Sequence, residues 1–281
     1  ALLEALIPPS NAAILFSALT NVPVSQTFAA GVIPGLILLA FMVIVVLIKC
    51  RNIRNPEPAS AAERWRSFLG ALPGLFTPII ILGGIYAGLL TPSESAAVAG
   101  VWAIVMGFFI YRELTFASLC LALKETATIT AIIFAIIATA TFLSVVLTYS
   151  QIPQQIVSYF TDMGATFALF WVALAIICLL LGTFVEIVPV FYLTVPIFAA
   201  ITLSFNQSLL HLYVVFVAFA GIGMITPPVC VGIYTSASVI QENPAKAFRE
   251  VPLFVGVGIL YGILMILIPE ASTWLPSLLT R

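Results

Sequence analysis

The chain has 281 residues, of which 62% are hydrophobic and 7% are charged, with a formal net charge of -1. A soluble domain needs about a quarter of its residues charged to cover its surface. The composition therefore excludes a soluble globular protein and predicts a surface that faces lipid. Four cysteines stand far apart without metal-ligand spacing, so neither a disulfide framework nor a zinc site is indicated.

Apolar runs that end at prolines, glycines or charged residues divide the chain. They cover approximately residues 29 to 48, 71 to 90, 96 to 111, 127 to 149, 165 to 182, 188 to 204, 208 to 240 and 252 to 268. Several reach the ~20 residues that cross a hydrocarbon core as a helix, but two are shorter and one is too long. We therefore expect an all-α, multi-pass membrane protein whose helices are partly broken.

The first segment begins without Met, a basic region or a cleavage motif, so we expect no signal peptide and a start inside a longer protein. Pro8 and Pro9 remove two backbone donors, which predicts two half-helices around an unwound joint. Ser10 is placed to cap or line this joint. Glu4 precedes the joint by one turn, and the sequence does not decide whether this acid binds an ion, forms an ion pair or caps a helix.

The middle of the chain contains two segments expected to lie at the membrane surface. Residues 51–70 open as a Pro-rich loop and close as a short helix with Trp65 and Phe68, which is an interfacial composition. The segment Glu113 to Glu125 resembles a second interfacial helix. Between them, Thr91 to Glu94 fits a capping box, so capping is a better interpretation of Glu94 than ion binding.

Basic residues predict the orientation of the spans. Nine of the ten fall in three loops that alternate to one side, which the positive-inside rule makes cytoplasmic. They are Lys49, Arg51, Arg54, Arg64, Arg66, Arg112, Lys124, Lys246 and Arg249.

No Lys or Arg occurs between positions 150 and 207, where two apolar runs meet at LGTFVE. Two full crossings and a re-entrant hairpin over about 165–204 both satisfy the charge pattern. The hairpin is preferred because Thr183, Glu186 and Pro189 interrupt the runs near mid-depth. An acid within the membrane is a functional hypothesis by default, which predicts that Glu186 binds an ion. The alternative is a carboxylate that faces outer water and stabilises loop amides.

A second proline pair, Pro227 and Pro228, repeats the first. Each pair is followed some 25 residues later by a proline that opens a new span, Pro34 or Pro252. The charge pattern gives the two copies opposite directions, and inverted repeats with broken helices are typical of secondary transporters. Half-helix carbonyls suit Na⁺ and half-helix N-termini suit a carboxylate. The alternative is a pair of kinks needed only for packing.

Three glycines and one histidine complete the candidates. Gly182, Gly221 and Gly223 allow close backbone approach, for a site or equally for ordinary helix packing. His211 has no acid three or four residues away, which favours an interfacial hydrogen bond over a proton relay.

The sequence resembles the large membrane subunit of tripartite ATP-independent periplasmic (TRAP) transporters, of the DctM/SiaM-like kind, over essentially its whole length. The resembling segments, in the same order as in that family, are IPPS at 7–10, the run Gly83 to Leu114, LGTFVE at 181–186, GMITPPV at 223–229 and IPEASTWLP at 268–276. This chain would be the C-terminal part of such a subunit. Where the family often has Asp and Gly, it has Glu186 and Cys230.

The resemblance implies an inverted-repeat, elevator-type secondary transporter in a bacterial inner membrane, and no enzyme. The resemblance also divides the chain into four parts. Residues 1–50 would hold the first broken helix and its following span, and residues 51–70 a cytoplasmic loop and interfacial helix. Residues 71–126 would hold scaffold-type helices and an arm helix, and residues 127–281 the transport elements of the second repeat. Expected partners are a small TRAP membrane subunit, a periplasmic binding protein, an organic acid such as a C4-dicarboxylate or sialic acid, and the lipid bilayer; no nucleic acid is expected.

The predicted cofactor is Na⁺ alone, with no organic cofactor. The predicted Na⁺ ligands are Ser10, Gly182, Thr183, Glu186, Gly221, Gly223 and Thr226. The predicted substrate-binding residues are Pro8, Pro9, Ser10, Asn11, Thr226, Pro227 and Pro228. Three other functions remain to be weighed: a Na⁺ symporter of related fold without a binding protein, a channel, and an intramembrane enzyme, for which the catalytic motifs are missing.

Overall fold

The computed structural model describes residues 2–51, 59–162, 167–228, 231–241, 243, 245 and 248–279. Arg54, Cys230 and Lys246 therefore lie outside the described residues. All regular secondary structure within these ranges is helical. The chain forms two compact units, residues 1–46 with 136–281 and residues 47–135, and each is described by itself.

Within the described residues, seven helical segments are long and apolar enough to cross a bilayer. The number rises to eight if the bent pair at the C-terminal end, with an angle of 58°, counts as one span. The shortest of the seven has 18 residues, which corresponds to about 27 Å of helix and is close to the thickness of a hydrocarbon core. The expected all-helical, multi-span architecture is thus present.

The first unit is built mainly from short and broken helices. Its N-terminal part holds α1 (Leu2–Leu6), α2 (Asn11–Thr20) and most of α3 (Val24–Cys50). Its C-terminal part holds the end of α6 (Phe116–Tyr149), from Ile136 onward, followed by α7 (Ile152–Asp162), α8 (Phe167–Phe184), α9 (Ile187–Ser204), α10 (Leu209–Ile225), α11 (Val231–Ile240), α13 (Val251–Leu267) and α14 (Glu270–Leu279).

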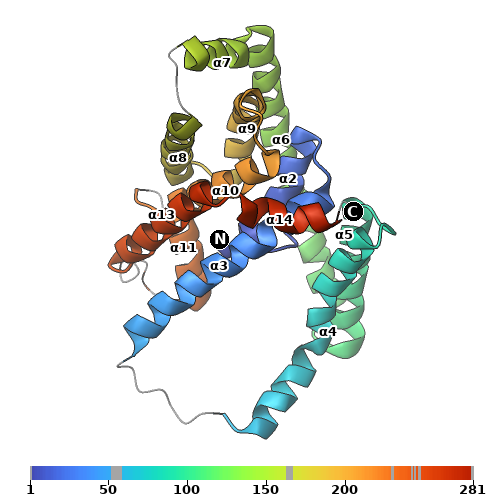
Figure 1. The fold of residues 1–281 in the computed structure, drawn as a ribbon. Helices are drawn as coiled ribbons and strands as arrows, with labels where there is room; N and C mark the ends of the chain where they lie inside the picture. The colour runs from blue at the N-terminus through green and yellow to red at the C-terminus, as the bar shows by residue number, and fades with distance from the viewer. Residues whose placement is uncertain are drawn as a thin grey trace. The chain divides into compact units, whose positions relative to one another are not determined.

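Both proline pairs interrupt helices, as the sequence predicts. The first break separates α1 from α2. The second separates α10 from α11, which are both labelled in Figure 1. Pro252 opens α13 as expected, but the expectation that Pro34 opens a span is wrong. Pro34 lies inside the continuous helix α3, because a single proline removes only one hydrogen bond of the ladder.

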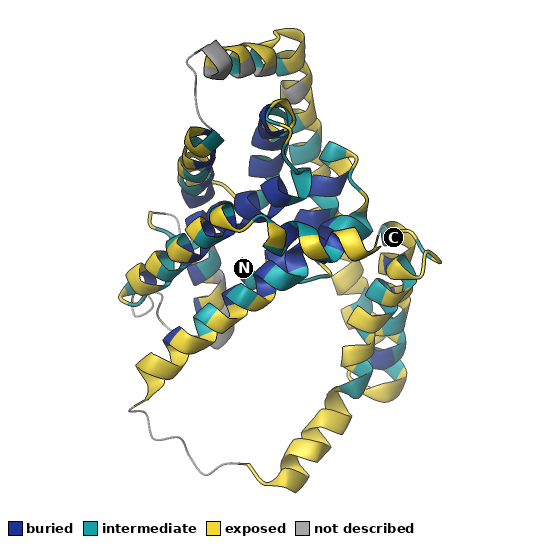
Figure 2. Ribbon diagram, viewed as in Figure 1, coloured by how far each residue is buried: buried dark blue, intermediate teal, exposed yellow. Residues whose placement is uncertain are grey.

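Helix α10 forms the core of the first unit. Every residue from His211 to Gly223 is buried (Figure 2). The helix is apolar on all sides and packs against α1, α2, α8, α9, α13 and α14. A helix without a polar face is stable only when it is surrounded, so this composition places α10 at the centre.

Helices α8 and α9 form an antiparallel hairpin. The ring of Phe167, at the start of α8, lies 5.5 Å from the ring of Phe205, just beyond the end of α9. One turn deeper, Phe170 and Phe198 meet at 6.2 Å. The tip of the hairpin is therefore the short connection at Val185 and Glu186. Each arm has 18 residues, so its length fits either a full crossing or a re-entrant arm.

The second unit contains a helical hairpin of α4 (Ala61–Tyr86) and α5 (Pro92–Val105), which continues as a short π-helix, η1 (Met106–Ile110). The indole of Trp102 donates to the carbonyl of Pro73 at 3.1 Å, and the hydroxyl of Tyr111 donates to the carbonyl of Gly70 at 3.0 Å. These bonds hold the two helices together along their length.

The two segments expected as separate interfacial helices are the first turns of longer helices. The helix expected to end near residue 70 continues to Tyr86 as α4, and the one expected at 113–125 belongs to α6. In α4 the junction contains Gly70 and Pro73, but a single proline removes only one hydrogen bond of the ladder and the helix continues through it. The sequence of α6 contains neither proline nor glycine, so nothing ends that helix near residue 125. No α4 residue is buried, and large apolar side chains such as Ile79 are exposed, as on a surface that lipid or another protein covers.

Candidate functional site

The first proline joint is closed by Ser10. This serine is buried, and its hydroxyl donates to the carbonyl of Ala5 at 2.7 Å and accepts from the amide of Ala13 at 3.4 Å. It is the N-cap of α2, so one side chain connects the last turn of α1 with the first turn of α2. Beside it, Pro8 is half-buried, whereas Pro9 and Asn11 are exposed.

The end of α1 is held by two other helices. The carbonyl of Ala5 also accepts from the buried hydroxyl of Tyr213, on α10, at 2.7 Å. Gly31 of α3 packs so closely on the carbonyl of Leu6 that a side chain there would overlap it. The carbonyl of Ala5 thus has both lone pairs engaged by hydroxyl groups, and we do not count it among possible cation ligands.

The second joint begins at Thr226, the C-cap of α10. Its hydroxyl donates to the carbonyl of Ile222 at 2.7 Å, and its amide donates to the carbonyl of Gly223 at 2.8 Å. Thr226 is half-buried, and Pro227 and Pro228 are exposed. The threonine therefore ends the helix while its hydroxyl oxygen keeps lone pairs for another partner.

The hairpin tip reaches the same end of α10 as the second joint. Near their starts, Trp171 of α8 and His211 of α10 meet with ring centroids 4.8 Å apart. Near their ends, a Cβ placed on Gly182 would lie 3.1 Å from the Cα of Gly223. The two helices therefore run side by side in the same direction, and both end beside the Gly182–Gly223 contact. Gly221 faces another neighbour, Leu2 of α1.

Oxygen atoms accumulate at this end. Thr183 is buried, and its hydroxyl donates to the carbonyl of Leu180 at 2.7 Å. Glu186 is exposed and begins α9 without a side-chain capping bond. Hydroxyl, carboxylate and carbonyl oxygens are the ligands that hard cations prefer. The tip and the second joint together can supply such ligands from two different helices.

The two predicted joints lie at different levels of α10. Tyr213 touches the first joint, and Thr226 opens the second. The helix between these residues rises by roughly 20 Å. The described contacts thus join the hairpin tip with the second joint, and they join the first joint with the N-terminal half of α10. Sequence reasoning missed Tyr213, because a tyrosine in an apolar run carries no signal of a partner 208 positions away.

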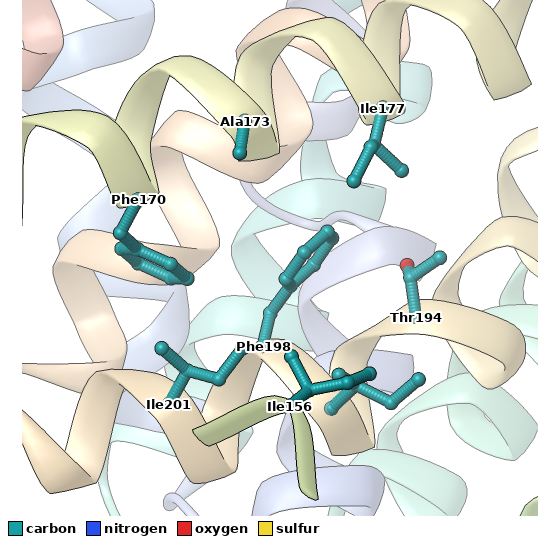
Figure 3. Close-up of a pocket in the computed structure, with 8 residues that line it drawn as sticks. Ile156, Phe170, Ala173, Ile177, Thr194, Phe198 and Ile201 are labelled. Carbon is teal, nitrogen blue, oxygen red and sulfur yellow. The ribbon is translucent and has the colours of Figure 1, made fainter. Parts of the chain in front are cut away.

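A cavity of about 160 Å³ lies between α7, α8 and α9. Figure 3 shows Phe170, Ala173 and Ile177 of α8 opposite Thr194, Phe198 and Ile201 of α9, with Ile156 of α7 at one side. The hydroxyl of Thr194 donates to the carbonyl of Val190 at 2.7 Å. An apolar cavity of this kind offers no ligands for an ion or a carboxylate.

His211 makes a structural hydrogen bond. Its Nδ1 lies 3.0 Å from the hydroxyl of Ser272, which itself donates to the carbonyl of Pro269. The imidazole is buried and connects α10 with α14. The expected hydrogen bond is therefore present, and the place of His211 at the membrane interface stays a prediction.

Comparison with known proteins identifies the family. Residues 1–271 match the family model described as "Tripartite ATP-independent periplasmic transporter, DctM component". The chain is 34% identical over 274 residues to the C4-dicarboxylate TRAP transporter large permease protein DctM of Pseudomonas aeruginosa, with 97% of this chain and 64% of that protein covered.

Two other relatives carry different substrate names. The ectoine/5-hydroxyectoine TRAP transporter large permease protein UehC of Ruegeria pomeroyi is 31% identical, and the sialic acid TRAP transporter large permease protein SiaM of Vibrio cholerae is 30% identical. Each alignment covers 97% of this chain and 64% of the relative, so the chain spans less than two thirds of their length. With its apolar helices and these matches, the chain belongs to the DctM family of TRAP transporter large permeases, which are multi-pass membrane proteins.

Proposed function

We propose that this chain is the C-terminal part of the large permease of a Na⁺-coupled TRAP transporter in a bacterial inner membrane. It would work with a small membrane subunit and import an organic acid that a periplasmic binding protein delivers. C4-dicarboxylates, sialic acid and 2,3-diketo-L-gulonate, named for relatives, are organic acids, which supports this substrate class.

The observation that carries Na⁺ coupling is the shared end of α8 and α10. Thr183 and Thr226 each donate their hydroxyl proton to their own helix, so each oxygen retains lone pairs. Glu186 adds a carboxylate at the same end, and the Gly182–Gly223 contact allows the two backbones to approach closely. A cation held here would tie the hairpin tip to the second joint.

The substrate carboxylate would be received by helix N-termini. α2 begins directly after Ser10, and α11 begins after the second proline pair, so both start at a joint. The partial positive charge of a helix N-terminus favours an anion. In the proposed cycle, Na⁺ binding organises the re-entrant hairpin tip, substrate binds, and the hairpin-bearing elements slide past the scaffold as an elevator.

Uptake in proteoliposomes tests this function. The full-length large subunit is reconstituted with its small subunit, and uptake of labelled C4-dicarboxylates and sialic acid is measured with and without a Na⁺ gradient and the binding protein. Uptake that requires both supports the proposal. Uptake that needs Na⁺ alone indicates a direct symporter of related fold, and Na⁺-independent flux indicates a channel.

A matched set of valine variants locates the ion site. Thr226→Val and Thr183→Val keep the branched shape but remove the oxygen, and we expect each to raise the Na⁺ concentration for half-maximal uptake by about tenfold, as expected when one charge-assisted ligand is lost. Thr194→Val is the control, because Thr194 is as buried as Thr183 and, like both test residues, donates its hydroxyl proton within its own helix, but it lines the apolar cavity. An unchanged Na⁺ titration in both test variants would exclude this site.

A further inference from the structure

Tyr213 connects the second broken helix to the joint of the first. Its hydroxyl donates to the carbonyl of Ala5 at 2.7 Å, across 208 positions of sequence. Both residues are buried, and the tyrosine ring packs on Phe16 of α2 with centroids 5.4 Å apart. One side chain of α10 therefore contacts both half-helices on either side of the Pro8–Pro9 break.

The carbonyl of Ala5 also accepts a hydrogen bond from the hydroxyl of Ser10, so the hydroxyls of Tyr213 and Ser10 both bind one peptide group. Ser10 reaches Ala5 from the far side of the break, at 2.7 Å. Because a peptide group is planar, two bonds to its oxygen fix its orientation, and with it the direction in which the following residues leave α1. Leu6 is held in addition by the backbone contact with Gly31.

We infer that Tyr213 is a positioning residue for the first joint, which the second repeat thereby holds in its binding geometry. We assign Tyr213 no ligand role, because it is fully buried and its hydroxyl and ring contact Ala5 and Phe16, far from the hairpin tip and the second joint. Its part in substrate binding rests on the proposed function, in which the N-terminus of α2 receives a carboxylate, whereas its part in ordering residues 7–10 does not.

The chain provides a matched control in Tyr261. This tyrosine of α13 is also fully buried, but its hydroxyl has no hydrogen-bond partner among the described residues. Tyr213→Phe removes a bonded hydroxyl and Tyr261→Phe removes an unbonded one, with the same loss of one oxygen atom. A general effect of altering a buried tyrosine would appear in both variants.

The first measurement is amide hydrogen exchange of the full-length subunit in nanodiscs, without any ligand. In Tyr213→Phe, we expect the peptide covering residues 2–20 to exchange about fivefold faster, as expected for the loss of one buried hydrogen bond. Tyr261→Phe should match the wild type. Equal exchange in wild type and Tyr213→Phe, or equal acceleration in both variants, would overturn the inference.

The second measurement separates positioning from general stability. In Na⁺-driven uptake, Tyr213→Phe should raise the half-saturating substrate concentration about fivefold, because the N-terminus of α2 at this joint is proposed to receive the substrate carboxylate, while the maximal rate per folded transporter is retained. Loss of maximal rate with an unchanged half-saturation would show that Tyr213 only supports the fold. If the wild type shows no Na⁺ dependence, the proposed function fails, but the exchange result still decides whether Tyr213 orders the joint.

A double variant tests whether the two hydroxyls share one acceptor. Ser10→Ala or Tyr213→Phe alone leaves the Ala5 carbonyl with one donor, and both together leave it buried without either. The exchange rate of residues 2–20 should therefore rise by more than the product of the single effects. Simple multiplication would show that Ser10 and Tyr213 act independently.

Discussion

At the scale of single residues, glycine pairs decide how closely the helices of the first unit approach. A Cβ on Gly223 would lie 2.6 Å from the carbonyl oxygen of Leu179 and 2.7 Å from the Cα of Gly182. Both are backbone atoms that cannot rotate away. The sequence indicated close approach at these glycines but not their partner, because spacing within one helix does not show which other helix it meets.

Gly223→Ala should therefore push α8 and α10 apart. We expect a loss of about 1–3 kcal/mol of stability, as is usual for overpacking, and a strong loss of uptake. Gly256→Ala on α13 is the control, since a Cβ there meets nothing within 4 Å and alanine favours the helix. Thermal unfolding of purified subunits measures the difference, and equal melting temperatures for the two variants would contradict the packing argument.

At the scale of elements, the sequence predicts breaks better than it predicts continuity. The proline pairs and the hairpin connection were located correctly, because missing donors and interrupted apolar runs are local properties. Helix α7 was missed because it is short and lies between longer apolar runs. The first turns of α4 and α6 were expected as separate helices, since their amphipathic composition differs from that of the spans they begin.

The start of α5 shows a local prediction that the structure confirms. Glu94 accepts from the amide of Thr91 at 2.7 Å, and the hydroxyl of Thr91 accepts from the amide of Glu94 at 3.3 Å. Ser60 and Glu63 form a second capping box at the start of α4, which was not predicted.

Glu94→Gln should keep the cap, because glutamine can replace glutamate in a capping box, whereas Glu94→Ala should lower the melting temperature of the subunit. Neither change should alter the Na⁺ dependence of uptake. The check is thermal unfolding together with a Na⁺ titration of each variant. If Glu94→Gln shifted the Na⁺ titration as strongly as Glu94→Ala, Glu94 would have to be assigned to ion binding rather than to capping.

At the scale of the whole molecule, the charge pattern predicts one orientation for the chain. Cys50 ends α3 beside Lys49 and Arg51, and Cys120 lies in the first turns of α6 between Arg112 and Lys124, so both lie in basic segments expected on the cytoplasmic side. Both cysteines are exposed, whereas Cys178 is buried. Labelling of the native thiols can therefore test the predicted orientation without changing the charges on which the prediction rests.

Single-cysteine subunits should react with a membrane-impermeant maleimide as follows. Cys50 and Cys120 should be labelled in inside-out vesicles and protected in intact spheroplasts, and Cys178 should react in neither until the protein is denatured. Ser204→Cys, at the exposed end of α9, should show the opposite sidedness, because the hairpin is expected to open outward. Labelling of Cys50 and Cys120 from opposite sides would contradict the predicted topology.

The enclosure of α10 restricts where members of this family can change their sequence. A helix surrounded on every side has no spare face on which substrate-specific side chains could change without disturbing a neighbour. Relatives that differ in the molecule they carry are therefore expected to differ at the ends of α10, at the hairpin tip or in separate polypeptides. We therefore expect the middle of α10 to stay constant among relatives, while the parts that recognise different substrates vary around it.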